Sequence, residues 1–120
     1  MASDSYHEPP GSLGRETRHM HQAIASLMEE LEAVDWYQQR IDATTDEDLK
    51  AILAHNRDEE KEHAAMVLEW LRRRDPQLDE QLKTYLFTAG DVADQEEAES
   101  GAPARGDGSL GIGSLRKRGE

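Results

Sequence analysis

The segment from Arg57 to Leu71 reads RDEEKEHAAMVLEWL, and its periodicity decides the fold. Apolar residues recur at steps of three and four, which is typical of an amphipathic helix and not of a strand. Glu60 and His63 fall on the line that the apolar residues occupy. Surface charge alone does not explain a carboxylate and an imidazole on the face that is expected to be buried.

The helix that contains this segment is expected to run from about residue 46 to Arg74. Thr45 or Asp46 can cap its start, and acidic residues at 46–48 favour the positive end of the helix dipole. Three arginines close it, at the end where cations oppose the dipole. The residues on its apolar stripe follow 4-3-4-3-4-3 spacing: Leu49, Leu53, Asn56, Glu60, His63, Val67 and Trp70.

A second amphipathic pattern precedes this helix and begins at Leu13. Its stripe comprises Met20, Ile24, Leu27, Leu31, Val34 and Ile41, with Gln38 filling the one gap. The polar segment DATTDEDLK then interrupts the periodicity, so the two helices are expected to form an antiparallel hairpin. Pro76 is expected to open a short third helix that ends before Gly90.

The remaining segments differ in composition from the hairpin. Residues 1–12 are expected to be a flexible N-terminus and residues 13–90 a single helical domain. Residues 91–106 are polar and contain Gly and Pro, so we expect a disordered linker there. Residues 107–120 return three apolar side chains to a segment too short to bury them: Leu110, Ile112 and Leu115.

Composition restricts the class of protein. The chain has 120 residues, of which 36% are hydrophobic, and this thin core favours an oligomer. A net charge of −12 argues against nucleic acid or an anionic membrane as a partner and favours cations. Cysteine is absent, which excludes disulfides and thiolate metal sites. We find no signal-peptide pattern or apolar run that could span a bilayer, and therefore expect a cytoplasmic protein.

Glu60 and His63 form a Glu-x-x-His motif, whose members project from one face of a helix. In carboxylate-bridged di-iron bundles, each such helix is paired with a helix that supplies one more glutamate. Glu30 fits that role. With a rise of about 1.5 Å per residue, Glu30 and Glu60 each lie about 21–23 Å along their helices from the expected turn, so they stand at the same height in the hairpin. Hard carboxylates suit Fe(II) and Fe(III), and an imidazole completes the ligand set.

Other interpretations of the same residues stay open at this point. The run DEEKEH is also compatible with a solvated helix face, and Glu59 lies four residues before His63, so the register is not unique. One chain also supplies only half of a di-iron site. A second copy related by a two-fold axis would complete a four-helix bundle with the metals between the chains.

Longer stretches carry a more specific signal. MEELEAVDWYQQRIDATTD, ILAHNRDEEKEHAAMVLEWLRRRD and KTYLF closely resemble the encapsulated ferritins, and the similarity covers roughly residues 7–88. The tail sequence DGSLGIGSL resembles the peptide that targets cargo to encapsulin shells. The resemblance implies an all-α hairpin protomer that dimerises into a ferritin-like bundle and assembles as a decameric ring of five dimers.

The same resemblance implies ferroxidase activity and an iron store inside an encapsulin nanocompartment. It implies that Glu30, Glu60 and His63 are the ligands of a di-iron centre shared by two chains. Glu29 and Glu32 match an outer acidic site for incoming metal, where calcium or another divalent cation would bind. Trp36 and Tyr37 match aromatic residues beside the centre, and Tyr37 is the better candidate to assist it because a phenol can hydrogen-bond a carboxylate.

Two other functions remain in view. A peroxide-reducing di-iron protein would use the same ligands, although the chain has no cysteine for a rubredoxin-like electron donor. A non-catalytic assembly module would use the metal only to hold two chains together. The residue spacing suggests no role for His7, His19 and His21. His55 is expected to be a polar interface residue.

Overall fold

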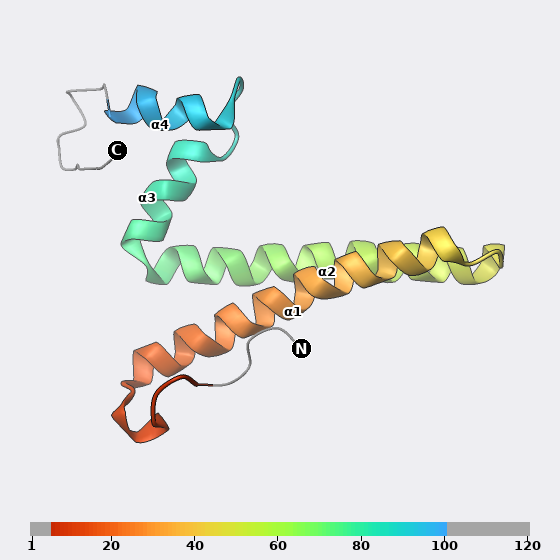
Figure 1. Ribbon diagram of the computed structural model, residues 1–120, viewed down its shortest axis with the longest axis horizontal. Coiled ribbons are helices and arrows are strands. Elements are labelled where there is room, and N and C mark those ends of the chain that lie inside the picture. The colour runs from red at the N-terminus through yellow and green to blue at the C-terminus, as the bar shows by residue number, and fades with distance from the viewer. Residues whose placement is uncertain (1–5, 101–120) are drawn as a thin grey trace. The chain divides into compact units, whose positions relative to one another are not determined.

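The computed structural model describes residues 6–100, and every regular element in that range is helical. The elements are η1 (Pro10–Ser12), α1 (Arg15–Ala43), α2 (Glu47–Arg74), α3 (Pro76–Tyr85) and α4 (Val92–Ser100) (Figure 1). The all-α prediction is therefore confirmed. Within the described range, no helix combines the length and apolar character that crossing a membrane requires. The chain divides into two compact units, residues 1–74 and 75–120, which we describe separately.

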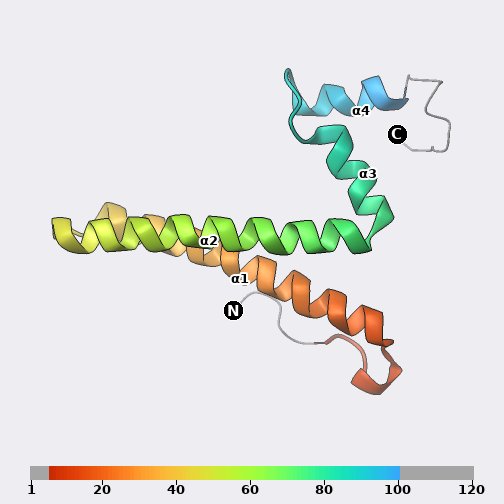
Figure 2. The same cartoon turned by 180° about the vertical axis from the view of Figure 1, so that it is seen from behind.

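The first unit is an antiparallel hairpin of α1 and α2, and α1 crosses α2 in both views of the ribbon (Figure 1, Figure 2). A turn of three residues joins the helices. The backbone N–H of Asp46 donates to Thr44 Oγ1 at 3.2 Å, and the Asp46 carboxylate accepts the N–H of Leu49 at 3.1 Å. Asp46 thus caps α2, as one of the two candidate residues.

Helix α1 carries apolar residues on two neighbouring lines along its surface, and one of these lines faces α2. The half-buried line runs through Ala23, Leu27, Glu30, Val34, Tyr37 and Ile41. Ile24 and Leu31, which we expected on the buried stripe, are 44% and 54% exposed. The expectation is wrong for these two residues because α1 carries apolar residues on two adjacent lines, and a single partner helix covers only one.

A similar shift of one residue occurs on α2. Ala64 and Leu71 are buried, at 7% and 3% exposure, whereas His63 and Trp70 lie at the edge of the interface and are half-buried. In the part of the chain whose side chains are described, Ala64 and Leu71 are the apolar residues that form the core. The hairpin core is thin, as the composition suggested.

Several large apolar side chains of the hairpin remain open to solvent. The uncovered stripe, as we call this set, comprises Ile24, Met28, Leu31, Leu49, Ile52 and Met66. Ile52 and Met66 are 57% and 58% exposed, and their spacing of eleven and three residues from His63 places them on its side of α2. Apolar surface of this extent on a small unit is typical of a surface that another chain covers.

The N-terminal segment has a defined path from Tyr6 onward. Residues 10–12 form η1, and the ring of Tyr6 lies 4.6 Å from the ring of His21, with an angle of 44° between the planes. His21 therefore packs against an aromatic residue within its own unit. His7 and His19 are exposed, and the described residues suggest no role for them.

In the second unit, the Asp75 carboxylate caps α3 by accepting the N–H of Leu78 at 3.0 Å, and Pro76 occupies the first turn. Residues 92–100, which we expected to belong to a disordered linker, form α4 instead. Ala, Gln and Glu favour helix, and Asp94 lies in the first turn, so a helix forms without an apolar stripe. Residues 101–106 of the expected linker and the tail residues Leu110, Ile112 and Leu115 lie outside the described residues.

Candidate metal centre

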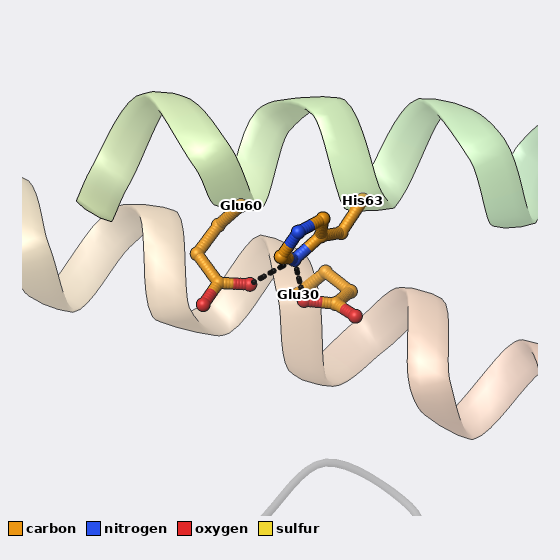
Figure 3. Close-up of side chains that lie close together, drawn as sticks. All are labelled: Glu30, Glu60 and His63. Atoms are coloured by element: carbon orange, nitrogen blue, oxygen red, sulfur yellow. Dashed lines mark ion pairs between the residues drawn. The ribbon is translucent and has the colours of Figure 1, made fainter. Parts of the chain in front are cut away.

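Three side chains from the two hairpin helices converge on one point. Glu30 projects from α1, and Glu60 and His63 project from α2 toward it (Figure 3). His63 Nδ1 lies 3.7 Å from Glu30 Oε1 and 3.4 Å from Glu60 Oε1. One ligand atom from each residue lies within 4.8 Å of the others, which is close enough for a single ion to contact all three.

The local structure explains why these residues meet. Glu60 and His63 are three residues apart on α2, so they share a face of the helix. Glu30 lies on the line of α1 that faces α2. The short turn between the helices fixes which residues of α1 and α2 stand opposite each other. The side chains of Glu30, Glu60 and His63 keep 26%, 23% and 41% of their surface exposed, so the cluster is shielded but reachable.

The electrostatics of the cluster favour a bound cation. A hydrogen bond with Glu60 raises the pKa of Glu30, and burial and the charge of Glu60 act in the same direction. Glu29 adds a smaller repulsion, while His63 acts in the opposite direction. A cation that binds between two carboxylates replaces their shared proton and removes the repulsion between their negative charges.

The donor set fits iron. Two carboxylate oxygens and one imidazole nitrogen match the ligand preferences of Fe(II), Mn(II) and Zn(II) better than those of soft ions. Three protein donors also leave positions for water, for dioxygen or for ligands from another chain. His63, the most exposed of the three, lies on the same side of α2 as Ile52 and Met66 of the uncovered stripe.

Either Glu59 or Glu60 could be the carboxylate that acts with His63, and the structure places these two glutamates differently. Glu60 joins the cluster, whereas Glu59 Oε2 lies 3.8 Å from His55 Nε2 and outside the cluster. The side chains of His55 and Glu59 are 71% and 49% exposed. The geometry therefore favours Glu60 as the carboxylate of the Glu-x-x-His motif.

The other residues singled out in the sequence lie apart from the cluster. Glu29 and Glu32 are half-buried on α1 and do not belong to the one group of three potential ligands found among the described residues. Tyr37 follows Glu30 by two turns, about 10 Å along the axis. The Arg40 guanidinium lies 5.5 Å from the centre of the Tyr37 ring. Trp36 is 45% exposed.

A helical hairpin with an inward Glu-x-x-His motif and a facing glutamate places the chain among the ferritin-like helical proteins. Comparison with known proteins agrees. The family model described as EncFtn-like matches residues 5–89, and the chain belongs to this family of encapsulated ferritin-like proteins.

Individual relatives extend the similarity along the chain. The encapsulated ferritin-like protein of Rhodospirillum rubrum is 60% identical over 97% of this chain and 91% of its own length. The encapsulin nanocompartment cargo protein EncC of Myxococcus xanthus is 42% identical over 73% of this chain and 77% of its own. A crystal structure of a Nitrosomonas europaea protein superimposes with a TM-score of 0.73 at 66% identity, covering 75% of this chain and 99% of the other.

Proposed function

We propose that this chain is a ferroxidase, which oxidises Fe(II) to Fe(III) at a di-iron centre formed between two copies. The observation that carries the proposal is the convergence of Glu30, Glu60 and His63 at one point, each offering a ligand atom within 4.8 Å of the others. Membership of the encapsulated ferritin-like family supports it, because ferritins act on iron.

Each residue of the cluster has a role in this reaction. The carboxylates of Glu30 and Glu60 bind substrate Fe(II) in place of the proton they share, and their hard anionic oxygens favour Fe(III) still more strongly. His63 supplies a neutral donor that helps to fix the position of the ion. Each Fe(II) gives up one electron, and dioxygen is the oxidant that accepts it.

The completed centre is proposed to need a second copy of the chain. One hairpin provides two carboxylates and one imidazole, which is half of the set found in di-iron bundles. The uncovered stripe gives that second copy an apolar surface to cover beside His63. A two-fold axis would then place two half-sites together, and the family resemblance extends the dimer to a ring of five.

We also propose an encapsulin shell as the partner and the interior of a cytoplasmic nanocompartment as the location. Two relatives carry names that describe them as encapsulated or as encapsulin cargo. Residues 107–120 are the proposed address, with Leu110, Ile112 and Leu115 as the apolar anchors of a short peptide. Many tails on one oligomer would make even a weak contact effective through multivalency.

Stopped-flow absorbance with Fe(II) and dissolved oxygen tests the activity. We expect repeated turnover to Fe(III) in the wild type and loss of most activity in Glu30→Ala, Glu60→Ala and His63→Ala. Glu59→Ala is the matched control for the register of the motif, because its carboxylate lies beside His55 and outside the cluster, and its loss of activity should be much milder. Iron that binds stoichiometrically without turnover would instead support a purely structural metal, and faster turnover with peroxide than with oxygen would support a peroxidase.

A further inference from the structure

An arginine occupies the interface of the hairpin one turn before the cluster. Arg57 lies on the same side of α2 as Glu60, Ala64 and Leu71, and 22% of its side chain is exposed. A partly buried guanidinium is unfavourable unless its N–H groups find acceptors. Its side chain lies beside the interface residues, although the hydrogen bonds that it makes are exposed to solvent.

Arg57 finds its partners in a chain of hydrogen bonds that joins the two helices. Arg57 Nη1 donates to Gln38 Oε1 of α1 at 2.7 Å, and Arg57 Nε donates to Asp58 Oδ1 at 3.0 Å. Gln38 Nε2 in turn donates to Asp42 Oδ1 at 3.0 Å. The bond to Asp42 fixes which way the Gln38 amide points, so its oxygen faces Arg57. We call this chain of bonds the Arg57 clamp.

The apolar core fixes the rotation of α2 about its own axis only in part, because the side chains that α1 contributes to it, such as Leu27 and Val34, are half-buried. Its buried apolar residues, among those described, are a small Ala64 and a distant Leu71. Side chains end about 5–6 Å from a helix axis, so a rotation of about 20° moves them by about 2 Å. A binding site needs its groups placed to within about 0.5 Å, and a rotation of this size would separate Glu60 and His63 from Glu30.

We propose that Arg57 is a positioning residue, which sets the rotation of α2 through Gln38 and so aims Glu60 and His63 at Glu30. The proposal rests on the metal centre proposed above. Arg57 acts one turn, about 4.5 Å, from Glu60, where a directional bond constrains the rotation more effectively than apolar contact does. Arg57 itself binds no metal, because a guanidinium is always charged and has no lone pair to offer.

The test uses Co(II) and the full chain, because the visible absorption bands of Co(II) report ligand number and geometry without any turnover. Arg57→Met should shift these bands and weaken Co(II) binding by about tenfold or more, as losses of groups that orient metal ligands do. Arg57→Lys keeps a charged donor and should recover most of the wild-type spectrum. Arg73→Met is the matched control on the same helix, since Arg73 is 72% exposed and pairs with Glu69.

A second comparison separates positioning from general loss of stability. Leu53 is half-buried on α2 one turn before Arg57, so Leu53→Ala should lower the unfolding midpoint yet leave the Co(II) bands in place. An unchanged spectrum and affinity in Arg57→Met would overturn the role of Arg57, and so would an equal spectral shift in Leu53→Ala. A wild-type chain that bound no Co(II) would remove the metal centre and this inference together, whereas normal wild-type binding with an unaltered Arg57→Met would remove the inference alone.

Discussion

Replacing Ile52 by alanine should weaken pairing of two chains without weakening the hairpin. Burying an isoleucine fully contributes about 1.5–3 kcal/mol. Ile52 is 57% exposed in the hairpin, so a second copy that covered it would gain about 1 kcal/mol from each chain. A two-fold interface counts the residue twice, which gives about 2 kcal/mol and a dimer dissociation constant about 30 times higher.

Sedimentation velocity over a concentration series, with anaerobic Fe(II) present, measures this constant directly. Helix content by circular dichroism should not fall, because alanine is a better helix former than isoleucine and the side chain is exposed. Leu86→Ala is the control, since Leu86 is 44% exposed but belongs to the second unit. An unchanged dissociation constant in Ile52→Ala, or an equal change in Leu86→Ala, would show that the uncovered stripe is not where the chains meet.

Three further predictions concern charge and targeting. Because folding raises the pKa of Glu30 above its usual value of 4.5, the metal-free folded chain holds this proton more tightly than the unfolded chain. Its free energy of unfolding should therefore fall as pH rises from 4.5 through the raised pKa, and Glu30→Gln should remove that fall in urea titrations at successive pH values. Changing Glu29 and Glu32 together to alanine should slow oxidation at low iron and leave the rate at saturating iron intact; complete loss at saturating iron would make them ligands. Deleting residues 107–120 should preserve ferroxidase activity but abolish co-purification with a co-expressed cognate encapsulin shell, and normal loading would refute the address.

The hairpin could be predicted from sequence because its signals are local. Helical spacing and the polar turn indicate two helices, and Asp46 is one of few residues there able to cap the second. The meeting of Glu30 with the Glu-x-x-His motif followed from counting residues along both helices from one turn. Axial position is easy to predict in this way, since an error of one residue moves a side chain by only about 1.5 Å along the axis.

Rotation about the helix axis could not be predicted as well. A shift of one residue turns the buried face by about 100°, so Ala64 and His63 point in clearly different directions although they are adjacent. Apolar residues on two lines of each helix made the choice ambiguous, since the sequence contains both the line that the hairpin buries and the uncovered stripe. The sequence alone offers no reason to single out Arg57, because its proposed role depends on Gln38, which lies nineteen residues earlier in the chain. The helix α4 was missed because a polar helix without an apolar stripe has the composition of a linker.

The thin core and the paired carboxylates together explain why metal and assembly should be coupled. Of the apolar residues that the structure describes, only Ala64 and Leu71 are buried, so much of the apolar contact between the hairpin helices is half-buried. Repulsion between the Glu30 and Glu60 carboxylates also opposes their approach once both are ionised. A cation bound by carboxylates of both helices removes that repulsion. A ligand present at a hundred times its dissociation constant stabilises the state that binds it by about 2.7 kcal/mol. That gain is comparable to the apolar contribution of Ile52 in a symmetric dimer, so neither contact alone is expected to dominate the assembly. Metal-free chains should consequently pair more weakly than metal-loaded chains, because the free energy of cation binding is then missing from the assembly.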